Sequence, residues 1–265
     1  TYTTPTSPDP TVIGNRSSGD RAMNGPIRRI VIYPRAMSNA ELQAITTAGI
    51  KGLSVDQVSK FTTAQTAALT SAQVLALSAD QIVGLTTKQI SDLNTVTLQA
   101  LSAKQIAALE TGDVSLLGSS KITNLSSAQI RALTTAQIVA LTTAQVVAIE
   151  TTDILALTGS QLTALGTANV AALSNAQIAV LKNTQLAALS SSATSALTTN
   201  QVSSLTTTQL GAFTASQMVG FTTTQISAIS PASLAKLNSG AFGALGSSVV
   251  AVMTTSQIAS LDRKS

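Results

Sequence analysis

The 265-residue sequence contains no cysteine, histidine or tryptophan, and only 2% of its residues are aromatic. Without cysteine there is no disulfide or thiol chemistry, and without cysteine and histidine the usual zinc-ligand sets are missing. Histidine is also the most frequent general acid or base, and the 11 carboxylates are scattered along the chain. A core without large aromatic side chains must be built from Leu, Ile, Val and Ala. We therefore expect a non-enzymatic protein that uses no cofactor and no metal.

Charge is also scarce. Charged residues make up 10% of the sequence, against about 25% in a typical soluble domain, and the formal net charge is +4. Between residues 154 and 261 the only charged residues are Lys182 and Lys236. Such a surface of Ser, Thr, Ala and Gln repels copies of itself weakly, which favours self-association into a homo-oligomer or filament. Solubility from hydroxyls alone and O-glycosylation are the alternatives. Polar residues interrupt every apolar run, so we expect no membrane span.

What the chain does have is a strict period of eight. An apolar anchor residue falls at every eighth position from Met37 to Leu261, and these 29 anchors bound 28 octads. The cap site, one residue after the anchor, is Ser, Thr or Asn in 22 octads. The glutamine site, four after the anchor, is Gln or Glu in 18 octads. The inner site, five after the anchor, is apolar everywhere except at Thr66 and Thr194. A short fixed period indicates a repeat protein.

The pattern has a physical interpretation as a helix start in every octad. Ser/Thr-x-x-Gln/Glu is a capping box, in which the hydroxyl accepts from the third helical N–H and the long side chain reaches back to the cap N–H. The anchor before the cap and the inner site then form a hydrophobic staple. The clearest stretch assigns structural caps and staples to Leu133, Thr134, Gln137, Ile138, Leu141, Thr142 and Gln145.

Three other architectures fit less well. In one continuous helix the anchors would advance by about 80° per octad and spiral around the rod, and coiled coils need periods of seven or eleven. A β-solenoid suits the Thr, Val and Ile content, but anchor and inner site lie five apart, which places them on opposite faces of a strand. We therefore predict a mainly α protein, a solenoid of short capped helices, with a β-solenoid as the alternative. Isolated helices this short are marginal, so neighbouring octads must bury each other's apolar side chains. The number of octads per turn is left open.

The chain divides by composition into four parts. Residues 1–10 are rich in Pro, Thr and Ser and are predicted to be a linker or arm. Residues 11–36 contain the one clear strand pattern, Ile27 to Tyr33, and are predicted to form a small β remnant. Residues 37–261 form the octad array, and residues 262–265 a charged tail. The chain begins with Thr1 rather than Met, so we expect a piece of something longer.

Two resemblances follow from these motifs. The run from Val12 to Leu42, with Asn24-Gly25-Pro26-Ile27 and a strand ending in Tyr33-Pro34-Arg35, resembles the end of a laminin-G-like, concanavalin-like jelly-roll domain. The Arg-Arg and Tyr-x-Arg version is similar to that of phage tail-fibre proteins. The octads resemble the Leu-Thr-x-x-Gln-Ile-x-Ala arrays of bacterial extracellular surface proteins. The first resemblance implies a cell-surface glycan as partner, bound through a jelly-roll head that is missing from this chain.

Few residues remain as candidates for chemistry. Glu110/Asp113 and Glu150/Asp153 are the acid pairs three residues apart, and as helix-start acids they suit the positive end of the helix dipole better than catalysis or cation binding. The basic cluster around Arg28 and Arg29 has one neighbouring ring, which disfavours nucleic-acid binding. A solvated strand face or a subunit contact fits better, and the residues of such a contact would be Ile27, Arg28, Arg29, Ile30, Ile32 and Tyr33.

Together these features predict a structural protein located outside a bacterial cell, on its surface or on a virion. The first hypothesis is a fibre, stalk or self-assembling filament. The alternative is a rigid spacer of an adhesin or tail fibre whose carbohydrate-binding head lies upstream.

Overall fold

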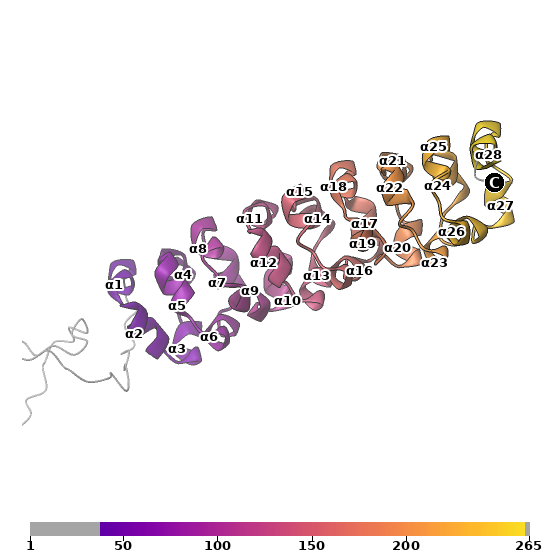
Figure 1. The fold of residues 1–265 in the computed structure, drawn as a ribbon. Helices are drawn as coiled ribbons and strands as arrows, with labels where there is room; N and C mark the ends of the chain where they lie inside the picture. Colours follow the sequence, from indigo (N-terminus) through magenta and orange to yellow (C-terminus); the bar gives the residue numbers. More distant parts are fainter. Residues whose placement is uncertain (1–37, 263–265) are drawn as a thin grey trace, which may run out of the picture. The chain divides into compact units, whose positions relative to one another are not determined.

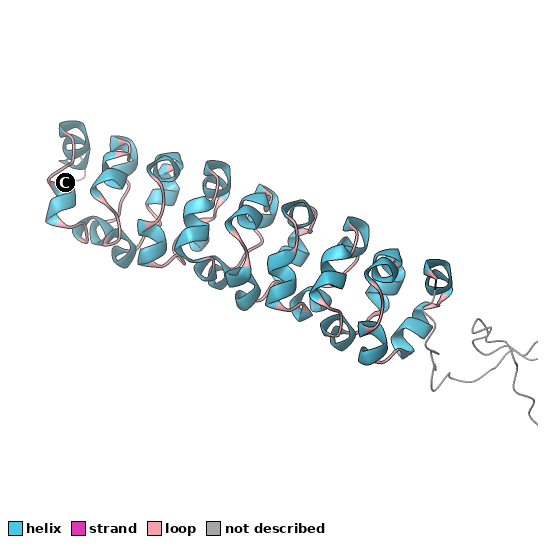
Figure 2. Cartoon of the chain, turned by 180° about the vertical axis from the view of Figure 1, so that it is seen from behind, coloured by secondary structure: helices cyan, strands magenta, loops and turns pink. Residues whose placement is uncertain are grey.

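The computed structural model describes residues 38–262, and this part of the chain is built from 28 short helices (Figure 1). Residues 38–262 are mainly helical, at 67%, and contain no strand (Figure 2). The predicted solenoid of short helices is thereby confirmed, and the β-solenoid alternative is not supported. The predicted linker, β remnant and most of the charged tail lie outside the described residues. The same holds for the predicted subunit contact between Ile27 and Tyr33.

Helices α1 to α27 each end one to three residues before the next anchor. Leu141 illustrates this: its N–H donates to Ile138 O at 3.3 Å, while its backbone is already extended at φ −64°, ψ 134°. The following cap residue, Thr142, is extended as well, at φ −75°, ψ 158°. Here two extended residues turn the chain before the next capping box starts a new helix, whereas between α16 and α17 Leu165 is helical at φ −56°, ψ −33° and Gly166 has φ 72°. The helices therefore stay between four and eight residues long.

Residues 38–262 belong to two compact units, which meet in the sequence at Asp113 and Val114. The helices of the first unit are α1 (Asn39–Ala44), α2 (Thr47–Gly52), α3 (Val55–Ser59), α4 (Thr63–Ala68), α5 (Ser71–Ala76), α6 (Ala79–Val83), α7 (Thr87–Asp92), α8 (Thr95–Gln99) and α9 (Ala103–Ala108). Helix α10 (Thr111–Leu116) contains the boundary.

The second unit continues the same pattern. Its helices are α11 (Ser119–Thr123), α12 (Ser127–Ala132), α13 (Thr135–Ala140), α14 (Thr143–Ala148), α15 (Thr151–Ile154), α16 (Gly159–Ala164), α17 (Gly166–Ala172), α18 (Asn175–Val180), α19 (Asn183–Leu186), α20 (Ser191–Ser195), α21 (Thr199–Ser204), α22 (Thr207–Leu210), α23 (Ala215–Met218), α24 (Thr223–Ser227), α25 (Pro231–Leu234), α26 (Ser239–Gly243), α27 (Ser247–Val250) and α28 (Thr255–Asp262).

Within each unit, a helix packs against the third helix before it and the third helix after it. In unit 1 such pairs include α2 with α5 and α4 with α7, and in unit 2 α13 with α16 and α18 with α21. Side-chain hydrogen bonds between stacked turns join residues 28 apart, and 28 divided by 8 is 3.5 octads. In Figure 1, α11, α15, α18, α21, α25 and α28 accordingly lie in a row along one edge of unit 2, in steps of three or four helices. One superhelical turn therefore takes about three and a half octads.

The core of each unit is a thin column of anchors and inner sites. In the second unit Leu173 is 3% exposed and Ile178 0%. The inner sites are covered by the following turn, as the last octads show: Val250 is 39% and Ile258 52% exposed, whereas Ile226, one turn earlier, is 0%. Burial of each octad thus depends on its neighbour, which explains how helices of four to eight residues remain stable.

Candidate functional site: the buried glutamine ladder

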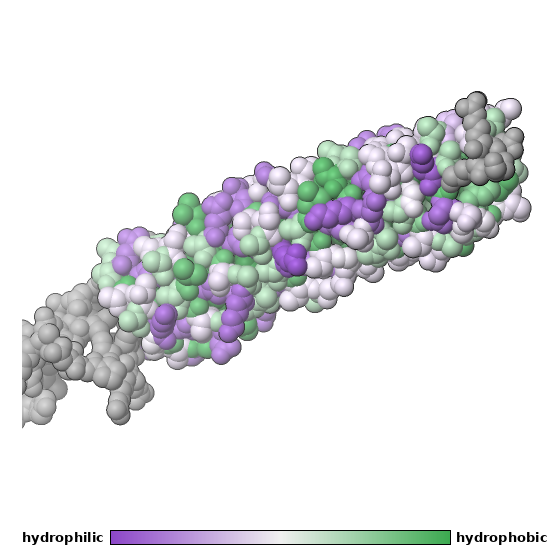
Figure 3. Space-filling view, in the orientation of Figure 1, coloured by the Kyte–Doolittle hydropathy of each residue, from purple (hydrophilic) through white to green (hydrophobic). Residues whose placement is uncertain are grey.

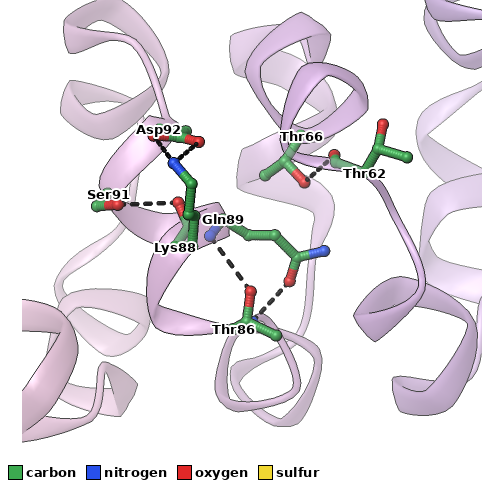
Figure 4. A network of polar contacts seen from close by, with 7 residues as sticks. All are labelled: Thr62, Thr66, Thr86, Lys88, Gln89, Ser91 and Asp92. Carbon is green, nitrogen blue, oxygen red and sulfur yellow. Dashed lines mark hydrogen bonds and ion pairs between the residues drawn. The ribbon is translucent and has the colours of Figure 1, made fainter.

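Each capping box joins the residue at a cap site to the glutamine three residues later by two hydrogen bonds. Thr134 N donates to Gln137 Oε1 at 2.7 Å, and Gln137 N donates to Thr134 Oγ1 at 3.2 Å. The next octad repeats the arrangement with Thr142 and Gln145, at 2.8 Å and 3.3 Å. Figure 4 shows the same reciprocal pair formed by Thr86 and Gln89. Each box satisfies two backbone N–H groups that a helix start would otherwise leave unpaired.

The predicted staple residues lie in the core. Leu133 and Leu141 are each 4% exposed, and Ile138 is fully buried. The cap residues Thr134 and Thr142 are exposed, so the hydroxyl side of each box faces solvent. The structure therefore places the cap at the surface and the anchor and inner site inside.

The glutamine side chains have a second function that the sequence argument missed. Gln177 Nε2 donates to Val146 O at 3.0 Å and to Ile149 O at 2.7 Å, 31 and 28 residues earlier. In unit 1, Gln105 Nε2 donates to Val74 O at 2.8 Å and Leu77 O at 2.9 Å. The accepting carbonyls belong to an inner site and an anchor of the preceding turn. We call this repeated set of inter-turn hydrogen bonds the glutamine ladder.

The geometry is visible in Figure 4. The amide oxygen of Gln89 faces Thr86 on its own helix start, while the amide nitrogen points to the neighbouring turn. That nitrogen donates to Phe61 O and to Ser59 O, the latter at 3.3 Å. One amide thus caps its own helix and ties two turns together.

Burial makes these hydrogen bonds energetically important. Gln105 is 3% and Gln177 2% exposed, and each uses its oxygen on its own cap and its nitrogen on the previous turn. A buried amide without partners costs roughly 1–3 kcal/mol on mutational scales, so complete pairing is what permits glutamine inside the array. The ladder also fixes the register between turns, because each donor meets carbonyls at set positions.

A signal for the ladder was present in the sequence. A capping box needs only an acceptor at this site, and the helix dipole favours Glu over Gln there. Of the 18 octads with Gln or Glu at the glutamine site, 17 have Gln, and the one Glu is Glu41. Such a preference for the amide indicates that its N–H groups are needed as donors.

Octads that depart from the consensus are accommodated individually. Asn169 has a shorter amide, and its Nδ2 reaches one carbonyl, Leu141 O, at 3.1 Å. Thr194 occupies an inner site at 0% exposure, and its hydroxyl donates to Ser190 O at 3.0 Å. Lys182 occupies a cap site without an acceptor side chain, so α19 keeps only the half of the box in which Lys182 N donates to Gln185 Oε1 at 2.9 Å.

The two acid pairs differ from each other. Asp113 Oδ2 accepts from Glu110 N at 2.9 Å, which reproduces the backbone half of a capping box. Asp153 accepts a hydrogen bond at Oδ1 from Ser127 Oγ of the preceding turn. Glu150, the cap residue of α15, makes no side-chain cap bond. The Glu side chains therefore do not cap the helices in these octads. At α10 the carboxylate of Asp113 is the capping group.

Comparison with known proteins supports the repeat assignment. Residues 116–148 and 146–183 each match the model of the ALTTAQ repeat family. The matched stretch, 116–183, covers 68 of 265 residues and lies within the second unit. It includes the octads of Thr134/Gln137 and Thr142/Gln145. No curated protein matches the sequence, and the laminin-G-like resemblance is not supported. The chain thus contains an octapeptide array similar to ALTTAQ repeats.

Among residues 38–262, no helix combines the length and the apolar character that crossing a lipid bilayer requires.

Proposed function

We propose that this chain is a non-enzymatic structural segment that forms a fibre, stalk or self-assembling filament outside a bacterial cell or on a phage particle. The observation that carries the proposal is the glutamine ladder. Within each unit, glutamine sites repeatedly donate buried amides to carbonyls of the turn before, as Gln177 and Gln201 do, so a further 28 residues can extend the same packing. An architecture that gains length without a new kind of interface suits a structural element.

The composition of the surface supports self-association. From residue 154 to 261 the only charges are Lys182 and Lys236, and the exposed side chains there include Val219 at 69%. Figure 3 shows the corresponding pale and green surface with scattered hydrophilic side chains. Copies of such a surface repel each other weakly, and burial of its exposed methyl groups favours contact.

The test is electron microscopy and sedimentation velocity of the whole chain over a range of protein concentrations. A self-assembling segment gives filaments or oligomers whose size increases with concentration. Adding charge with Thr199→Glu and Thr207→Glu should raise the concentration needed for assembly, while the acids remain favourable at helix starts. The matched control is Ala103→Glu, at the same octad position in unit 1. Monomers at every concentration would refute the filament.

The second candidate is a rigid spacer of an adhesin or tail fibre. It rests only on the sequence resemblance of Val12 to Leu42 to a jelly-roll terminus, which the comparisons do not support, and it would place a glycan-binding head upstream. A spacer predicts single particles at all concentrations and no effect of the Thr199 and Thr207 substitutions on sedimentation.

A further inference from the structure

At Asp113 an acid occupies the glutamine site, and one of its oxygens is buried without a partner. The residue is 1% exposed. Its Oδ2 accepts from Glu110 N at 2.9 Å, whereas its Oδ1 has no hydrogen bond. Buried polar atoms without partners are uncommon, and an unpaired buried carboxylate oxygen is especially costly.

The register of the ladder identifies the groups around this oxygen. In unit 1 the amide at the glutamine site donates to carbonyls 31 and 28 residues earlier, as Gln105 does to Val74 O and Leu77 O. The equivalent carbonyls for Asp113 belong to Ile82 and Leu85. A carboxylate has no N–H to offer them, so the amide donor that other glutamine sites supply is missing here.

A comparison with Asp153 shows what Asp113 lacks. Asp153 Oδ1 accepts from Ser127 Oγ, 26 residues earlier. The residue 26 before Asp113 is Thr87, whose Oγ1 would lie 3.9 Å from a β-carbon on Gly112. The Thr87 hydroxyl therefore lies close to the seam between α10 and the preceding turn of unit 1, yet Asp113 Oδ1 receives no hydrogen bond from it.

We propose that a hard divalent cation of the calcium class binds in this seam of unit 1. Asp113 Oδ1 and the carbonyls of Ile82 and Leu85 supply oxygen ligands, and water completes the coordination. Calcium takes six to eight oxygen ligands and accepts backbone carbonyls together with few carboxylates. No group of three or more acidic, His or Cys side chains gathers within the described residues, so the set consists of one carboxylate and backbone oxygens.

The charges favour a cation over a water molecule. Water supplies two hydrogens but leaves the carboxylate charge of Asp113 buried and uncompensated, whereas a cation neutralises it. Glu110, three residues earlier, is exposed and adds negative charge near the seam. Lys88, which follows Thr87 in the sequence, is paired with Asp92 at 2.9 Å rather than with Asp113.

The experiment uses the full chain after treatment with EDTA. Thermal unfolding is followed with and without CaCl₂, and calorimetric titration measures calcium binding. We expect one equivalent of calcium to bind. The midpoint of thermal unfolding should rise by about 5–10 °C when the free calcium concentration is about one hundred times Kd. Asp113→Gln restores the amide, so its midpoint in EDTA should exceed that of the wild type and should not respond to calcium.

Asp153→Gln is the matched control, because Asp153 already has Ser127 as a partner, and it should keep the calcium response. No calcium effect on the wild-type chain would overturn the proposal. A calcium response that persists in Asp113→Gln would overturn the proposal as well. Thr87→Ala tests whether the Thr87 hydroxyl is the partner of Asp113 instead. If this substitution lowers the midpoint of thermal unfolding equally with and without calcium, and calcium has no effect on the wild-type chain, the hydroxyl is the partner and the cation is excluded.

Discussion

Replacing one ladder glutamine should separate its capping function from its inter-turn function. Gln177 is suited to this test because it lies within unit 2 and is 2% exposed. Its oxygen accepts from Ser174 N at 2.8 Å, and its nitrogen donates to Val146 O and Ile149 O at 3.0 and 2.7 Å. Gln177→Ala removes these three hydrogen bonds and a longer one from Nε2 to Val147 O at 3.4 Å, and it leaves the residues Val146 and Ile149 buried without their amide donor.

The expected magnitude follows from these three bonds. A net contribution of about 1 kcal/mol for each gives a loss of about 3 kcal/mol, or about 6–12 °C in the unfolding midpoint of a unit of this size. Ser174→Ala removes only the cap hydroxyl and should cost about 1 kcal/mol. Asn175→Ala, at an exposed neighbouring position, should change stability by less than about 0.5 kcal/mol.

The assay is circular dichroism at 222 nm during heating, combined with hydrogen exchange to locate the weakened amides. Gln177→Glu sharpens the result at neutral pH, because it keeps the cap acceptor but turns the donor into a carboxylate facing two carbonyls. It should be at least as destabilising as alanine. If Gln177→Ala costs no more than Ser174→Ala, or if Gln177→Glu is neutral, the glutamine is only a cap and the ladder is refuted.

Three further substitutions test local details. Lys182→Thr supplies the cap hydroxyl that α19 lacks and should stabilise unit 2 by about 0.5–2 kcal/mol in the same melting assay, since Gln185 already completes the other half of the box. Gly220→Ala should destabilise by about 1–3 kcal/mol, because a β-carbon there would lie 2.4 Å from Ser191 O of the preceding turn. Gly243→Ala is the control, because no atom lies within 4 Å of the added carbon, and it should be neutral or stabilising by up to about 1 kcal/mol. Equal effects of the two glycine substitutions on stability would contradict the inter-turn packing.

The parts of the fold that the sequence predicts are those with local causes. A cap such as Thr134 and its partner Gln137 are three residues apart, so their hydrogen bonds need no knowledge of the tertiary structure. The anchors and inner sites also follow from the period, because short helices must bury these side chains against neighbours. This accounts for the correct expectation of short helices in a solenoid.

The long-range features could not be predicted in the same way. The rotation per octad depends on the backbone angles of two extended residues, such as Leu141 and Thr142, so the period of eight leaves the number of octads per turn undetermined. Pairs such as Asp153 with Ser127 can be recognised only when the length of a turn is known. Ile258 has the same sequence pattern as the buried inner sites, yet it is exposed because no following turn of the described residues covers it.

The register between turns is the central structural claim, and a disulfide measures it directly. The sequence has no native cysteine, so introduced thiols have no competitors. A β-carbon on Gly159 would lie 2.8 Å from Ala188 Cβ, and Thr163 Oγ1 also donates to Ala188 O, at 2.6 Å. Since disulfides prefer a Cβ–Cβ distance of about 3.8 Å, the Gly159→Cys, Ala188→Cys pair needs a shift of about 1 Å.

The control pair is Gly159→Cys with Ala196→Cys, which moves one thiol by a single octad. After mild oxidation, mass spectrometry and non-reducing electrophoresis should show an intramolecular disulfide between positions 159 and 188, and none between 159 and 196. A disulfide that forms readily at 159/196 but not at 159/188 would contradict a turn of three and a half octads, and with it the glutamine ladder on which the proposed structural function depends.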